Sequence, residues 1–173
     1  MTDYDRRVKS QGHEFSTVEV QINGNVEVSE GDLIFLDRVD GLRNQGSSEL
    51  TNYGFPFSYV SGSTNTLLSN SSLAKDNFLG VAGWHSDSGV TERITVYTSG
   101  LFKYPLKNAR VAKLMYMITP TGLGSGTVLS DQQITIESSS TSNIGILADY
   151  GSFKGSVKFV LKTMFDPFSS TFY

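Results

Sequence analysis

Alternating apolar and polar residues predict a series of short β-strands along this chain. The clearest alternation covers residues 16–22, where every second side chain is a branched apolar one. Asn23-Gly24 follows, a dipeptide suited to the positive-φ positions of a tight turn, and the alternation resumes over residues 26–28. We therefore predict a β-hairpin at this point.

A second group of strands lies within residues 78–106. It contains a strand at 78–84, a polar turn, a strand at 93–98, a pivot at Gly100 and a third strand that ends at Pro105. Three successive strands with short connections predict an antiparallel meander.

The remaining apolar segments are short and separated by turn residues. Further strands are predicted at 33–36, 114–118 (ended by Pro120), 133–137, 144–149 and 157–162. The segment 107–113 is the one place where we expect a helical turn. Strands at this spacing are typical of sandwiches and barrels. The predicted fold class is all-β, an antiparallel β-barrel or β-sandwich of about nine short strands with one long surface-loop insertion.

Polarity divides the chain into three regions. Residues 1–14 are charged and almost free of apolar side chains, which predicts a flexible arm. Residues 15–165 form the predicted β domain, in which 37–77 is a long polar insertion that should be an elaborated loop or hold short strands near 53–60. Residues 166–173 form an aromatic tail that should pack on its own core or on a neighbour.

Composition narrows the classes of function. The 173 residues carry a net charge of −3, which gives no drive toward nucleic acid or anionic lipid, so we expect neither as a partner. There is no cysteine, so disulfides and thiolate chemistry are excluded. We find no apolar run that could span a membrane or serve as an export signal, and expect a soluble protein made in a cytoplasm.

Few residues suggest chemistry. The sequence WHSD at 84–87 holds the residue types of a hydrolase triad, but adjacent residues cannot reach one another in the required order. His13 is the only other histidine, so a zinc site is not expected. Asp37, Asp40 and Glu49 could line a calcium site, although their spacing lacks the usual alternation of ligands. We expect no catalytic residue, cofactor, metal or small-molecule substrate.

Three groups of residues are candidates for contacts with other proteins. An aromatic cluster serves either local packing or a contact surface and comprises Tyr53, Phe55, Phe57 and Tyr59. A basic strip is either a solvated face or a docking site for an acidic partner and comprises Lys103, Lys107, Arg110 and Lys113. The candidates at the two ends are Arg6, Arg7, Lys9, Phe168, Phe172 and Tyr173.

Several short motifs recur in a recognisable order. They are GDLI at 31–34, FLGVA at 78–82, ITV at 94–96 leading to SGLFKYP at 99–105, IGILA at 144–148 and VKFVL at 157–161. In this order the chain resembles the capsid decoration, or head cement, proteins of tailed bacteriophages. It departs from their pattern in the length of 37–77 and at Lys113, where the family often has glycine.

The resemblance implies a virion protein without catalytic activity. Such a protein binds the outer surface of an assembled capsid, commonly as a homotrimer, and stabilises it by bridging neighbouring copies of the major capsid protein. One alternative is a phage tail, fibre or carbohydrate-binding β module, which would use exposed aromatic residues such as Tyr53, Phe57, Tyr59 or Trp84. Another is a hydrolase or calcium-dependent lyase, which would need a buried polar cluster.

Overall fold

The computed structural model describes residues 15–37, 53–61, 65–124, 126–149 and 151–165, and every structural statement below concerns those residues. Strands form nearly all of their regular structure, with one α-helix and one short 3-10 helix among the described residues. The sheets include a closed barrel and an antiparallel sheet of five strands. The predicted all-β fold class is therefore confirmed.

The first half of the chain forms the barrel. Its strands are β1 (Thr17–Ile22), β2 (Leu33–Leu36), β3 (Gly54–Pro56), β4 (Phe78–Ala82) and β5 (Glu92–Tyr97), joined in the order β1-β3-β2-β4-β5. β1 pairs with β5 along its whole length, whereas it meets β3 at one residue pair, Ile22 with Gly54. The barrel therefore has a seam beside β1.

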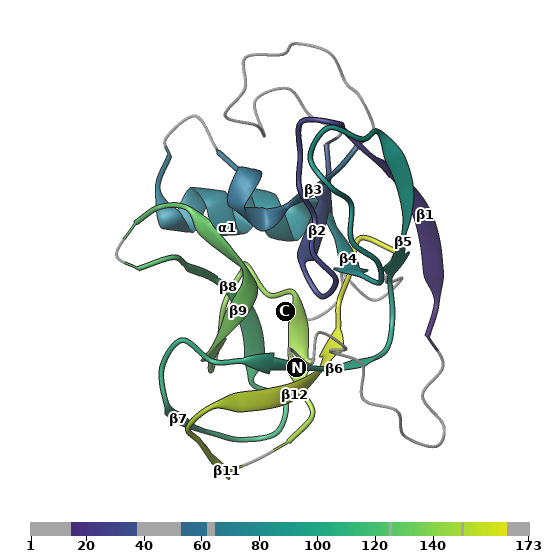
Figure 1. Ribbon diagram of the computed structural model, residues 1–173. Coiled ribbons are helices and arrows are strands. Elements are labelled where there is room, and N and C mark those ends of the chain that lie inside the picture. The colour runs from purple at the N-terminus through teal and green to yellow at the C-terminus, as the bar shows by residue number, and fades with distance from the viewer. Residues whose placement is uncertain (1–14, 38–52, 62–64, 125, 150, 166–173) are drawn as a thin grey trace.

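The second half forms the five-stranded sheet. Its strands are β6 (Leu101–Pro105), β12 (Ser156–Leu161), β10 (Gly145–Leu147), β8 (Met117–Gly122) and β9 (Leu129–Glu137), in that spatial order. The outer strands approach each other at a bridge between Leu106 and Ile134. A two-stranded ribbon, β7 (Arg110–Ala112) with β11 (Gly151–Phe153), lies at the far end of this half (Figure 1).

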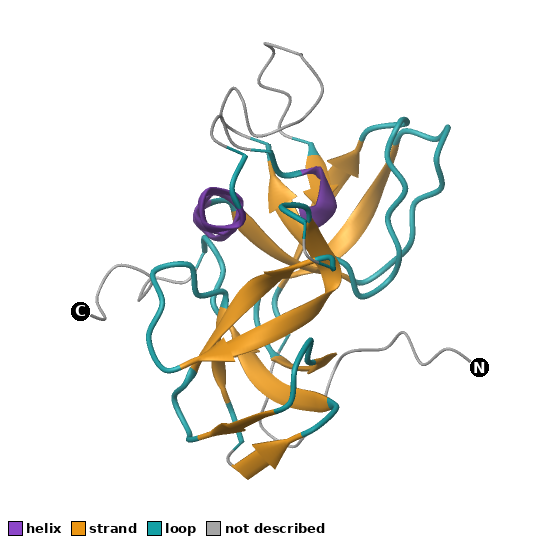
Figure 2. Cartoon of the chain, turned by 90° about the vertical axis from the view of Figure 1, so that its left-hand side faces the viewer, coloured by secondary structure: helices purple, strands orange, loops and turns teal. Residues whose placement is uncertain are grey.

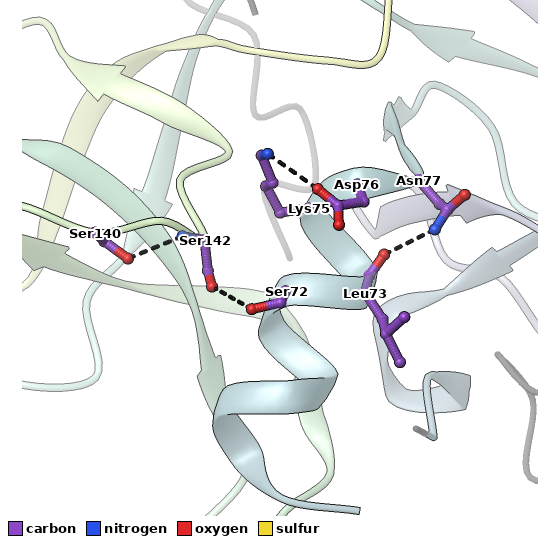
Figure 3. A network of polar contacts seen from close by, with 7 residues as sticks. All are labelled: Ser72, Leu73, Lys75, Asp76, Asn77, Ser140 and Ser142. Carbon is purple, nitrogen blue, oxygen red and sulfur yellow. Dashed lines mark hydrogen bonds and ion pairs between the residues drawn. The ribbon is translucent and has the colours of Figure 1, made fainter. Parts of the chain in front are cut away.

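The helix α1 (Leu67–Asp76) lies beside β8 and β9, and Figure 2 shows it nearly end-on. A capping box between Thr66 and Ser69 starts it. Ser72 and Ser142 share a hydrogen bond of 3.0 Å, which ties the helix to the loop before β10 (Figure 3). Sequence analysis missed this helix, because the face it buries consists of small and polar residues such as Asn70 and Ala74.

Two predictions of local structure, a hairpin and a helical turn, were wrong. Asn23-Gly24 forms a turn, closed by the Val26 amide donating to the Asn23 carbonyl at 2.9 Å, but no hairpin follows. Val28 forms an isolated bridge with Ser86 instead. The segment 107–113 contains β7 where we expected a helical turn. The short strands β3, β7 and β11 raise the number of strands to twelve.

The predicted meander is correct for β4 and β5 but not for its third strand, because β6 joins the other sheet. Gly100 lies at the crossing with φ 132°. A Cβ atom there would come within 2.4 Å of the Phe15 ring, so the position requires glycine for both backbone and space. The strand β8 also continues through Pro120, where we expected it to end.

Both halves share one hydrophobic core. Its cluster of buried residues includes Phe35 and Phe57 from the barrel half and Phe102 and Phe159 from the sheet half. Across the boundary, the Tyr104 hydroxyl donates to the carbonyl of Gly31. Packing and hydrogen bonding therefore hold the halves in a defined arrangement.

Candidate functional site

The outer face of the five-stranded sheet carries an apolar row. Sheet register places Leu101 of β6 beside Val160 of β12, Val160 beside Ile146 of β10, and Ile146 beside Met117 of β8. Phe159 and its alternating neighbours point to the core, so this row points outward. Val160 is 40% exposed.

Two lysines lie directly opposite each other next to this row. Lys103 of β6 pairs in register with Lys158 of β12, and both side chains are exposed. Within the described residues no carboxylate forms an ion pair with either ammonium. Like charges in this position repel each other, so the pair costs the isolated chain some stability. An acidic surface placed over them would remove that cost.

An exposed apolar residue lies close to this row. The Met115 amide donates to the Leu147 carbonyl at 3.4 Å, which places Met115 beside β10. Its side chain is 65% exposed. We call the apolar row together with Lys103, Lys158 and Met115 the docking face. It combines the exposed side chains of Val160 and Met115 with two lysines that have no ion-pair partner among the described residues, and both features are found in protein interfaces.

The predicted basic strip is only partly a surface feature. Lys103 and Lys113 are exposed, as an interaction site requires. Lys107 is instead tied down, because its ammonium donates to the carbonyls of Gly122 at 2.7 Å and Gly124 at 2.6 Å. The backbone of Arg110 lies in β7, and its side chain is outside the described part of the structure. Lys107 therefore acts within the fold.

The predicted aromatic cluster belongs mainly to the core. Phe55 is 2% and Phe57 0% exposed, so a contact role for these two side chains was wrong. The Phe57 ring lies 5.4 Å from that of Phe78 and meets it edge to face. Tyr53 and Tyr59 are partly buried and pack against the same core. Local packing, one of our two interpretations, is correct.

Other candidates lie outside the described residues. These are Arg6, Arg7, Lys9, His13, Asp40, Glu49, Phe168, Phe172 and Tyr173. Asp37, which could have lined a calcium site, is described and buried. Within the described ranges, no three His, Cys, Asp or Glu side chains are grouped as a metal site would need. The calcium hypothesis gains no support from this part of the chain.

The WHSD segment has no triad geometry. Ser86 is fully buried, and its hydroxyl has no hydrogen-bond partner among the described residues. His85 is exposed and lies against Trp84, with 5.3 Å between ring centroids. Backbone hydrogen bonds between Ser86 and Val28 in both directions fix the segment. His85 therefore does not activate the Ser86 hydroxyl.

Sequence analysis missed a pair of carboxyl groups where the halves meet. Asp32 precedes β2 and accepts hydrogen bonds from the Ser29 amide and the Gln132 side chain, both at 2.8 Å. Asp131 of β9 accepts from the Ser58 amide at 2.6 Å. About 100 residues separate the two aspartates, and although Asp32 belongs to the GDLI motif, nothing in the local sequence links it to Asp131. Only the tertiary fold brings them together.

These carboxyl groups line a polar pocket of about 380 Å³. Its lining residues are Glu27, Ser29, Asp32, Leu123, Ser130, Asp131 and Gln132. Burial raises the pKa of Asp131 from 3.8 to about 6, and the charge of Asp32 adds a smaller rise. The Ser58 hydrogen bonds act in the opposite direction. The Asp131 carboxyl can therefore gain or lose a proton near neutral pH.

Comparisons with protein-family models, with curated proteins and with solved structures found no match to this chain. Among the described residues, no helix has the length and apolar character needed to cross a membrane. Functional inference therefore rests on the motifs of the sequence and on the surfaces described above.

Proposed function

We propose that this chain is a structural virion protein that binds the outer surface of a phage capsid. The docking face carries the proposal. It joins the apolar row of β6, β12, β10 and β8 to Lys103 and Lys158, two exposed lysines that face each other, in a protein whose net charge is −3. Such a face favours a partner with an acidic, partly apolar surface, for which the major capsid protein is our candidate.

The decoration-protein resemblance supports the same proposal. Its motifs at 31–34, 78–82, 99–105, 144–148 and 157–161 coincide with or border β2, β4, β6, β10 and β12. They therefore fall on strands of both halves. Bridging neighbouring capsid subunits would stabilise the shell, because modest interfaces repeated at many equivalent sites add up. A homotrimer on the capsid exterior is part of this proposal.

Co-sedimentation with empty capsids of the virus that encodes the chain tests the proposal. We expect the protein to sediment with the capsids, and we expect the double variant Lys103→Glu, Lys158→Glu to lose most of that binding. Raised salt should weaken binding of the unchanged protein, because part of the attraction is between charges. Absence of any capsid binding at low salt would contradict the proposal.

A charge-matched control separates a specific face from general electrostatics. Lys75 lies on α1, away from the docking face, and pairs with the adjacent Asp76 at 2.9 Å. Lys75→Glu changes the net charge by the same amount as the single variant Lys103→Glu, with which it is compared, and should leave capsid binding intact. Equal losses in the control and in the docking-face variant would mean that this face is not the binding site.

One observation favours a second candidate, a carbohydrate-binding module. Trp84 is 58% exposed and lies beside the His85 ring, on a segment that the Val28–Ser86 bridge holds in place. A fixed, exposed indole is a suitable surface for the apolar face of a sugar ring. Trp84 is the only tryptophan in the chain, so its fluorescence reports directly on this position.

Titration with bacterial surface polysaccharides, followed by fluorescence, separates the two candidates. A saturable change in Trp84 emission that His85→Ala weakens would favour the carbohydrate-binding candidate. Unchanged emission together with capsid co-sedimentation would favour the decoration protein.

A further inference from the structure

One edge of β1 has almost no strand partner within the part of the chain that the structure describes. β5 forms hydrogen bonds with the other edge along Thr17–Ile22, but β3 reaches β1 only at Ile22. Among the described residues, no strand therefore pairs with this edge from residue 17 to residue 21. A free strand edge is a site where an extended segment can add by backbone hydrogen bonds.

An apolar groove lies along this free edge. Its volume is about 410 Å³, and its lining residues are Val18, Glu19, Val20, Gln21, Leu36, Leu79, Arg93 and Phe165. Val20 and Leu79 belong to the barrel core, so the groove opens into the seam of the barrel. Glu19, Gln21 and Arg93 form a polar rim. A strand with apolar side chains on one face would fill such a groove.

We propose that residues 166–173 of the same chain occupy this groove as an added strand beside β1. Phe165 already lines the groove and is 54% exposed, and the Met164 amide donates to the Phe78 carbonyl of β4 at 2.9 Å. The segment after Phe165 therefore starts at the groove. Its sequence, DPFSSTFY, places Phe168 and Phe172 four residues apart, on one face of an extended strand.

Length and charge agree with this occupant. Eight extended residues span about 27 Å, whereas the free edge from residue 17 to residue 21 needs about 17 Å. Asp166 at the start of the segment complements Arg93 on the rim. Covering the edge with the same chain also has a physical advantage, because a tethered segment has a high effective concentration at the groove. This inference concerns the barrel half and is independent of the proposed capsid binding.

Disulfide trapping tests the arrangement in the full chain, which has no native cysteine. Gln21→Cys is combined in turn with Ser169→Cys and Ser170→Cys. These two positions point to opposite faces of a strand, so one of them should lie on the Gln21 side. We expect one combination to form an intramolecular disulfide under mild oxidation in most molecules. As a control, Gln21→Cys with Ser152→Cys on β11, in the other half, should stay reduced (Figure 1).

Each outcome of the trapping experiment decides the proposal. Failure of both combinations, or the same yield in the control, would overturn it. Disulfide-linked dimers without the intramolecular product would show that a second copy supplies the strand, which would also overturn docking within one chain. The result does not depend on capsids, so it can fail while the proposed function holds.

Hydrogen exchange gives a second readout without added cysteines. Amides of residues 17–21 that face the groove should exchange roughly tenfold or more faster in Phe168→Ser, Phe172→Ser than in the unchanged chain. Ser169→Ala is the matched control and should leave the rates unchanged. Equal exchange rates in the double variant and the unchanged chain would contradict docking, because the added strand would then contribute no protection.

Discussion

The two halves of the molecule differ in the side chains at their outward-facing strand positions. On the barrel, one outward-facing polar pair is satisfied, because the Thr95 hydroxyl donates to the Glu19 carboxylate across the β1–β5 pair at 2.7 Å. On the five-stranded sheet, Lys103 faces Lys158, and Val160 stays 40% exposed. The outer strands of the barrel are adapted to water, whereas those of the sheet retain unmet charge and apolar area. The proposed function therefore belongs to the sheet.

The largest predicted effect tests how closely the barrel is packed. Gly80 of β4 has φ 153°, and a Cβ atom there would lie 1.9 Å from the Tyr97 carbonyl oxygen. We expect Gly80→Ala to cost more than about 4 kcal/mol of unfolding free energy, or to prevent folding. Thermal unfolding measures it. Gly155→Ala, which meets open space in the sheet half, is the control and should unfold almost as the unchanged chain does. A stable Gly80→Ala variant would show that β4 and β5 can separate easily.

The next prediction asks whether the halves unfold together. Phe57 of the barrel half and Phe159 of the sheet half are both fully buried in the shared core. Replacing either one by alanine should cost about 3–5 kcal/mol and leave one cooperative transition. Urea unfolding followed by Trp84 fluorescence and by circular dichroism checks this. If the two signals separated in either variant, the halves would be independent folding units.

A smaller effect concerns the carboxyl group at the boundary. Because the pKa of Asp131 is raised from 3.8 to about 6, the folded state binds more protons than the unfolded state between these pH values. Unfolding free energy therefore falls as pH rises through this window, and the full cost, about 3 kcal/mol, applies above it. A salt-bridged aspartate has the opposite pH dependence, because its lowered pKa makes the unfolding free energy rise with pH.

The variant Asp131→Asn should remove that cost while keeping an acceptor for the Ser58 amide. At pH 8 we expect the variant to be more stable than the unchanged chain by about 2 kcal/mol. The gain is smaller than the full cost, because the Ser58 amide exchanges a charged acceptor for a weaker neutral one. The difference should shrink toward zero near pH 4. Urea unfolding at several pH values measures it. A constant difference would mean that Asp131 titrates near its ordinary pKa.

The smallest predicted effect separates two neighbouring lysines. Lys107→Met should cost about 1 kcal/mol, because the carbonyls of Gly122 and Gly124 lose a charged donor. Lys103→Met should be neutral or slightly stabilising, because it removes the repulsion with Lys158. Chemical unfolding of both variants gives the comparison. Equal losses would contradict the different roles that we assign to them.

Periodicity predicted much of the fold because strands half in water leave a two-residue signature. Thr17–Ile22 was found in this way, whereas Leu33–Leu36 was predicted from a short continuous apolar run. The helix at Leu67–Asp76 was missed because it buries small polar side chains and depends on β8 and β9 for its position. Strand partners were harder to predict. The turn at Asn23-Gly24 is real, yet long-range pairing with β5 takes precedence over a local hairpin.

The docking face was only partly predictable, because its residues come from strands that are far apart in the sequence. Lys103 was identified from its local basic strip, but Lys158 lies 55 residues further along, and only sheet register brings the two together. Lys107 belonged to the same strip, and its hydrogen bonds to two carbonyls could not be read from spacing. Asp32 and Asp131 were missed as a pair because each is a single acidic residue in its local sequence and only the tertiary fold brings the two together.

The crossing at Gly100 has a consequence for the order in which the protein is made. Every barrel strand precedes this residue and every strand of the five-stranded sheet follows it, so a ribosome completes the barrel strands first. The helix α1 is synthesised with the barrel but packs on β8 and β9, which emerge later. During synthesis the nascent barrel would therefore carry an unpartnered helix until the second half arrives. Translation slowed after Gly100 would lengthen the time for which that helix is exposed to chaperones.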